Sequence, residues 1–164
     1  MRKILIIAAA CIALATLSFA AEMSDKPIVE KTAFVATLSG GEEVPAVMTD
    51  ATGKAAFSLS KNGMSLRYSV KVKNIENVTA AHIHTGKMGQ GGAPIALIKI
   101  TASKAGKFSG TLAKGKITEQ ELMTSYKGKT LKDLIAAMKS GDTYINVHTT
   151  KYPDGEMRGQ IMMK

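Results

Sequence analysis

Cysteine is almost absent from this sequence of 164 residues, which contains a single one, Cys11. Because Cys11 lies in an apolar N-terminal stretch that we expect to be removed, the mature protein would contain no thiol. No disulfide could then stabilise the fold, even in an oxidising compartment, and a cysteine nucleophile is excluded. The fold must therefore be held together by a hydrophobic core, for which the remaining chain is long enough.

Aromatic residues are also scarce, at 5% of the sequence with no tryptophan. Lysine and arginine number 22 against 13 acidic residues, so the chain has a formal net charge of +9 and should attract anionic partners. Nucleic acid is not the expected partner, because the lysines are dispersed and no row of aromatics lies between them to stack bases. An anionic polymer of the cell envelope, or another protein, fits the charge better.

A long apolar run is missing as well. The stretch from Ile4 to Leu17 has about 14 residues, whereas a membrane-spanning helix needs about 20. Arg2 and Lys3 precede this stretch and Ser18-Phe19-Ala20 follows it, which is the pattern of a secretory signal peptide. We therefore predict a signal peptide at residues 1–20, an N-terminal tail at residues 21–31 and one domain at residues 32–164. The mature protein should be periplasmic or secreted and should have no membrane span.

Short strands separated by turn signals make up most of the remaining chain. In the clearest case Leu66, Tyr68 and Val70 alternate with polar residues, which places them on one face of a strand. Asn62-Gly63 and Pro153-Asp154-Gly155 are typical of tight turns, so the strands that flank each turn should pair. The expected strands are Ala33–Leu38, Gly53–Leu59, Ser65–Val72, Val78–His84, Ile95–Ile100, Lys107–Leu112, Thr143–Thr149 and Glu156–Met162. This pattern predicts an all-β fold, an antiparallel Greek-key β-sandwich or barrel of about eight strands.

One segment, at residues 117–141, departs from the strand pattern. Leu131, Leu134, Ile135 and Met138 recur at helical spacing, Thr130 can cap the helix that they form, and Gly141 can end it. We interpret the segment as a short helical crossover that covers the core, rather than as a helix that binds a partner.

Histidine occurs three times, as His82, His84 and His148, and all three histidines fall within predicted strands. In a strand His82 and His84 share one face, with their bases roughly 6.6 Å apart, so both rings can reach one metal ion. His148 likewise lies on the polar face of its strand, opposite Ile145 and Val147. The alternative is that these are polar surface residues or histidines fixed by a backbone hydrogen bond.

The histidine motifs also carry a family resemblance. Four segments contribute to it: LSGGEEVPAV at Leu38–Val47, AAHIHTG at Ala80–Gly86, NVHT at Asn146–Thr149 and PDGEMRGQ at Pro153–Gln160. Together they resemble the CHRD (chordin-type) domain family, and the short signal is typical of a bacterial exported member. The resemblance implies a β-sandwich module of exported proteins, and it implies a fold rather than a particular reaction.

The sequence thus supports a metal-binding module in which His82, His84 and His148 hold a Cu or Zn ion. The first alternative is a structural or interaction module of the cell envelope that binds no metal. A further alternative is an oxidoreductase, because a His-x-His strand before a glycine-rich loop is similar to the copper-binding strand of copper–zinc superoxide dismutases. Three histidines and no cysteine pair cannot supply the two-metal ligand set and the disulfide of those enzymes. We predict no catalytic residue.

Overall fold

The computed structural model describes residues 32–101 and 104–164, so the predicted signal peptide and N-terminal tail lie outside the described residues. Eight strands and one α-helix, α1 (Leu131–Lys139), form the described part. The strands are β1 (Ala33–Ser39), β2 (Thr52–Leu59), β3 (Leu66–Thr85), β4 (Pro94–Leu97), β5 (Lys104–Ile117), β6 (Thr143–Thr149), β7 (Met157–Gln160) and β8 (Met162–Met163). Single turns of 3-10 helix occur at Gly40–Glu42, Glu119–Glu121 and Thr124–Tyr126.

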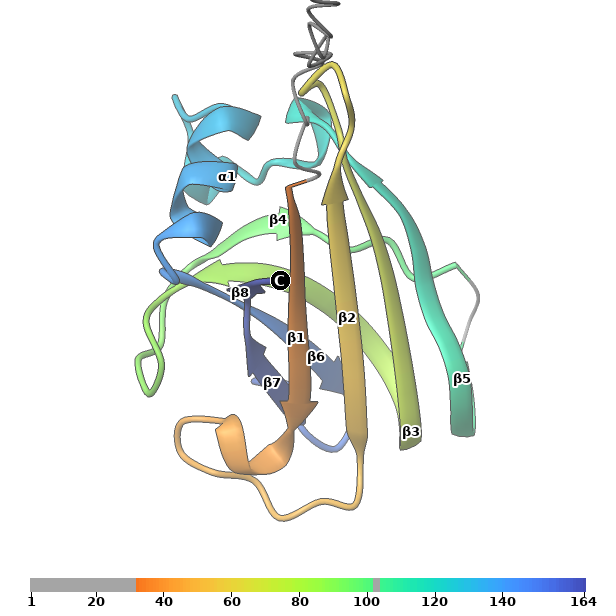
Figure 1. The fold of residues 1–164 in the computed structure, drawn as a ribbon. Helices are drawn as coiled ribbons and strands as arrows, with labels where there is room; N and C mark the ends of the chain where they lie inside the picture. The colour runs from red at the N-terminus through yellow and green to blue at the C-terminus, as the bar shows by residue number, and fades with distance from the viewer. Residues whose placement is uncertain (1–31, 102–103) are drawn as a thin grey trace, which may run out of the picture.

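The strands form a closed antiparallel barrel (Figure 1). Its strand order is β2-β1-β7-β6-β3, and the pairing of β2 with β3 closes the ring. The strands β4 and β5 extend from β3, while β8 adds to β1. The predicted all-β antiparallel architecture is therefore confirmed. Both predicted turns are also present, since β2 pairs with β3 and β6 pairs with β7.

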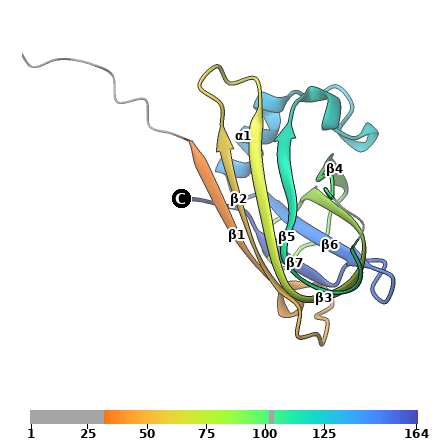
Figure 2. The same cartoon turned by 90° about the vertical axis from the view of Figure 1, so that its right-hand side faces the viewer.

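A single strand of 20 residues, β3, replaces two strands that the sequence predicted separately, Ser65–Val72 and Val78–His84. The polar residues between them do not end the strand, because Asn74 and Asn77 adopt positive φ angles of 55° and 51°, which asparagine tolerates. Each is held by β5: the Asn74 N–H donates to Ser109 Oγ, and Asn77 Oδ1 accepts from the Gly106 N–H. The strand therefore bends without breaking (Figure 2). Its first half pairs with β2 and β5, and its second half with β4 and β6.

The core fills the barrel and extends beneath α1. Leu131, Leu134, Ile135 and Met138 are buried, as their helical spacing predicts. Thr130 caps the helix, because its Oγ1 accepts from the Asp133 N–H and its own N–H donates to Asp133 Oδ2. The helical crossover between β5 and β6 is thus confirmed. No helix in the part of the chain described by the structure has the length and hydrophobicity needed to cross a membrane.

Candidate metal centre

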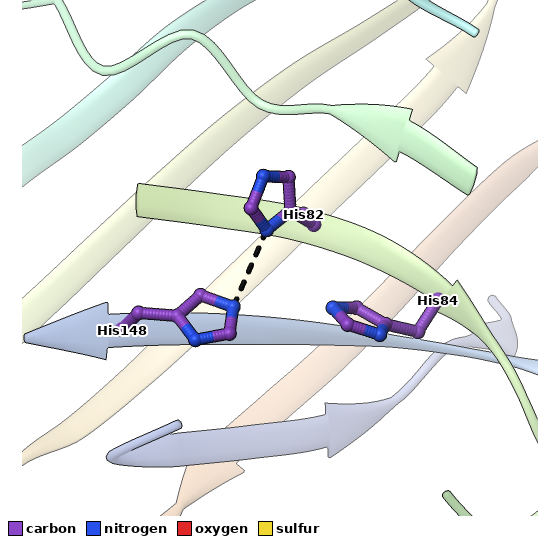
Figure 3. A group of neighbouring side chains, drawn as sticks. All are labelled: His82, His84 and His148. Atoms are coloured by element: carbon purple, nitrogen blue, oxygen red, sulfur yellow. Dashed lines mark hydrogen bonds between the residues drawn. The ribbon is translucent and has the colours of Figure 1, made fainter. Parts of the chain in front are cut away.

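The three histidines come together on one face of the paired strands β3 and β6 (Figure 3). In the register of these strands His82 lies opposite Asn146 and Ala80 lies opposite His148, so His82 and His148 are diagonal neighbours. Their candidate ligand nitrogens, together with that of His84, all lie within 4.8 Å of one another. Within residues 32–101 and 104–164 these side chains form the one such group of histidine, cysteine or carboxylate ligands.

The separation of the nitrogens fits a single tetrahedral ion. Two nitrogens bound at about 2.05 Å and at the tetrahedral angle lie about 3.3 Å apart. His82 Nδ1 and His148 Nε2 already have this separation, at 3.3 Å (Figure 3). Because every pair lies within 4.8 Å, the widest gap needs to close by at most about 1.5 Å, which small ring rotations can achieve.

Backbone carbonyls determine the tautomer of two of the rings. His84 Nδ1 lies 3.0 Å from Gly92 O, and His148 Nδ1 lies 2.8 Å from Pro153 O. A carbonyl oxygen only accepts, so both Nδ1 atoms carry the proton and the lone pair of each neutral ring lies on Nε2. His84 Nε2 is buried and has no hydrogen-bond partner among the described residues. This nitrogen is therefore oriented and free to bind a metal ion.

The rings of His82 and His84 favour their neutral form. Burial, together with the charges of His148 and His84, lowers the pKa of His82 to about 4. Burial also lowers the pKa of His84, although its bond to the Gly92 carbonyl opposes this shift. Because a metal ion binds the neutral imidazole, the lowered pKa of each ring favours metal binding over protonation.

The glycine-rich loop at residues 86–92 orients His84, because the Gly92 carbonyl accepts from the ring. The sequence indicated only that this loop lies beside the histidine pair. The Tyr144 ring stacks on His84 with centroids 4.9 Å apart, and the Gly92 N–H donates to the Tyr144 hydroxyl at 3.3 Å. A Cβ at residue 92 would collide with the backbone oxygen of Thr85, so only glycine fits here. Sequence periodicity could not have identified these contacts, because they join a loop to a distant strand.

A second polar group lies beside the histidines and was also missed. Asn146 is buried, and its Nδ2 donates to both carboxylate oxygens of Glu43 at 3.0 and 3.1 Å. Burial raises the pKa of Glu43 to about 7, against the opposing effects of Arg158 and Asn146. In the sequence Glu43 lies between two predicted strands, at a position typical of a solvated turn residue, whereas the structure packs it against Asn146 of β6. The preference of turns for polar residues gave no sign of this packing.

Arg158 completes the surroundings of the site. Its side chain is 3% exposed, and the guanidinium carbon lies 3.5 Å from the centroid of the Tyr144 ring. The guanidinium also donates to Lys87 O at 3.0 Å, which anchors the glycine-rich loop to β7. The stacking of Arg158 and His84 on Tyr144 therefore links the loop, β3, β6 and β7 around the histidines.

Comparison with known proteins gives one match. The CHRD domain family matches residues 34–161, a range that contains every strand except β8 and the first residue of β1. No curated protein and no solved structure matches the chain. The four segments that resemble the family at the level of sequence form the 3-10 turn followed by Glu43, the His-x-His part of β3, the part of β6 with His148, and the turn before β7 together with β7. This chain belongs to the CHRD domain family.

Proposed function

We propose that this protein is an exported metal-binding module that holds one copper or zinc ion on His82 Nδ1, His84 Nε2 and His148 Nε2. The observation that carries the proposal is the buried Nε2 of His84, which is oriented by Gly92 and has no partner in the described part of the chain. A buried polar atom without a partner costs about 1–3 kcal/mol. A metal ion would use its lone pair and remove this cost.

The type of ligand favours copper or zinc over other metals. Imidazole nitrogen suits Zn and Cu, whereas Ca and Mg require oxygen ligands, and the group contains no carboxylate. Three protein nitrogens leave one position of a tetrahedral ion for a further ligand. The exported location rests on the charged and apolar N-terminal pattern of the sequence.

In the metal-free protein the contact between His82 and His148 has a defined direction. Because His148 Nδ1–H donates to Pro153 O, His148 Nε2 is an acceptor, and His82 Nδ1–H donates to it. Binding a metal on His82 Nδ1 requires this proton to move to Nε2 of the same ring. The site can thus exchange one hydrogen bond for two coordinate bonds without changing the net charge of either ring.

Calorimetric titration of the metal-free purified protein with Zn(II) and with Cu(II) tests the proposal. We expect one ion per chain, and a large loss of affinity when His82, His84 or His148 is changed to alanine. The exposed Lys139→Ala variant on α1 is the control and should bind as the wild type does. Binding that survives His148→Ala unchanged would refute the shared site, and the absence of any binding would leave the interaction-module alternative.

A further inference from the structure

A row of strands away from the histidines presents a strongly basic surface. The strands β2 and β5 flank the first half of β3 on one side of the barrel (Figure 2), and alternate residues of these strands are exposed. We call this surface the basic face, and its cations are Lys54, Arg67, Lys71, Lys73, Lys114 and Lys116. All of these residues are exposed.

The strand register places like charges directly opposite one another on the basic face. Lys54 is paired with Lys71 across β2 and β3, and Arg67 is paired with Lys116 across β3 and β5. Like charges in such positions destabilise a sheet. The sequence therefore maintains an arrangement that is unfavourable for the isolated domain.

Acidic residues do not balance these charges. Neither aspartate nor glutamate occupies an exposed position of β1, of β2, of β3 from residue 66 to 73, or of β5 from residue 109 to 117. The one ion pair in the part of the chain described by the structure joins Lys99 to Glu121, neither of which belongs to the basic face. An external anion is consequently the natural counter-charge.

The basic face also has a depression that could accommodate part of a ligand. It has a volume of about 550 Å³, and its lining includes Lys54, Lys71 and Lys73 together with Gly53 and Gly110. Hydroxyl groups lie among the cations: Thr37 is opposite Lys54, Thr52 is opposite Lys73, and Thr111 is opposite Lys71. The surface therefore offers both charges for acidic groups and hydrogen-bonding groups for neutral hydroxyls.

We propose that the basic face binds a linear anionic polysaccharide. Lys71 and Lys73 on β3, and Lys114 and Lys116 on β5, are two residues apart along a strand, or about 6.8 Å, and neighbouring strands lie about 4.8 Å apart. A flexible chain with an acidic group on its sugars can meet several of these charges at once, while its hydroxyls bond to the threonines. Five of the six cations are lysines, which act as point charges and favour recognition of charge density over one fixed geometry.

Two other polyanions fit the basic face less well. A nucleic acid single strand would need aromatic side chains for its bases, and the outward positions of the basic face contain none. A bilayer would favour large apolar or aromatic anchors, whereas the exposed strand positions of the basic face carry none, and the exposed Val35 and Met64 lie only at its border. The polysaccharide requires neither feature.

The test is binding of the purified protein to dextran sulfate, with neutral dextran as the matched polymer, over a range of salt concentrations. We expect binding to dextran sulfate alone, with an affinity that falls as salt rises. The Lys54→Gln/Lys71→Gln variant should bind at least about tenfold more weakly. The slope of the logarithm of its binding constant against the logarithm of the salt concentration should be less steep by about 1 for each lysine removed. The control is Lys132→Gln/Lys139→Gln, which removes the same charge from exposed positions on α1 and should retain its affinity.

Folding and the metal site can be checked separately. Removing the opposed pair Lys54 and Lys71 should leave the melting temperature unchanged or raise it, and should leave metal titrations as in the wild type. Equal weakening in the α1 control would overturn the proposal, because net charge alone would then explain binding. Equal binding of neutral dextran, or tighter binding to anionic phospholipid vesicles or to single-stranded DNA, would also overturn it.

Discussion

His84 Nδ1 lies 3.0 Å from the carbonyl oxygen of Gly92, and this one hydrogen bond determines which nitrogen of the ring faces its two neighbours. The loop supplies the acceptor, and Tyr144 holds the loop by receiving the Gly92 N–H on its hydroxyl. The geometry of the histidine group therefore depends on residues that never contact a bound metal.

Tyr144→Phe should weaken metal binding without unfolding the protein. The phenyl ring can still stack on His84, but the hydroxyl that holds Gly92 is lost, so we expect a loss of about tenfold, at the lower end of the effect of such outer contacts on affinity. Competition titration with a chromophoric chelator measures the change. Tyr126→Phe, beside the core near α1, is the control and should bind as the wild type does. Equal affinity of both variants would show that the loop needs no support from Tyr144.

His82 should make the metal-free protein less stable as the pH falls. Its folded pKa of about 4 lies below the ordinary value of 6.5, so between these values the unfolded chain binds more protons and the free energy of unfolding decreases with falling pH. After allowance for solvent screening, the effect is on the order of 1–2 kcal/mol. Urea unfolding between these pH values measures it, and His82→Gln should flatten the dependence. An NMR titration midpoint of His82 near 6.5 would contradict the prediction.

Glu43 should have the opposite pH dependence. Its pKa is raised from 4.5 to about 7 in the folded protein, so the folded state holds the proton more tightly and loses stability as the pH rises through this range. Glu43→Gln should remove this loss, with a gain on the order of 1 kcal/mol above pH 7 and little change below pH 5. Thermal unfolding across this range gives the readout. The neighbouring exposed Glu42→Gln is the control, and a similar gain there would assign the effect to net charge.

Leu134→Ala should destabilise the domain by about 2–5 kcal/mol, because Leu134 is fully buried and the change leaves a cavity beneath α1. Ala136→Gly changes an exposed position of the same helix and should cost no more than about 1 kcal/mol. Denaturant unfolding distinguishes the two losses. Comparable losses in both variants would show that helix propensity, rather than packing, determines the contribution of α1.

Local periodicity was sufficient to predict the strand faces, the helix and the shared orientation of His82 and His84. A two-residue repeat assigns a side to each residue without reference to the rest of the chain. Local periodicity does not predict which strands lie side by side. His148 lies beside His82 because β3 pairs with β6, and this pairing joins residues far apart in sequence. The strand pattern permitted this pairing but did not determine it.

The interruption of β3 and the packing of Glu43 illustrate what the sequence could not provide. Asn74 and Asn77 resemble the residues of a turn, yet their hydrogen bonds to β5 allow the strand to continue through them. Glu43 resembles a solvated loop residue, yet it is partly buried against Asn146. In both cases a partner on another element decides the outcome, and local propensity contains no information about that partner.

The continuity of β3 also limits the distance between the basic face and the histidines. Lys71 in its first half and His82 in its second half belong to one hydrogen-bonded element, and at about 3.3 Å per residue the strand separates them by no more than about 36 Å. If a polymer is bound at Lys71 and a metal ion at His82, the ion therefore stays within this distance of the polymer. The strand would serve as a spacer of constant length, so the local concentration of the ion around the polymer would follow the spacing of bound domains along it.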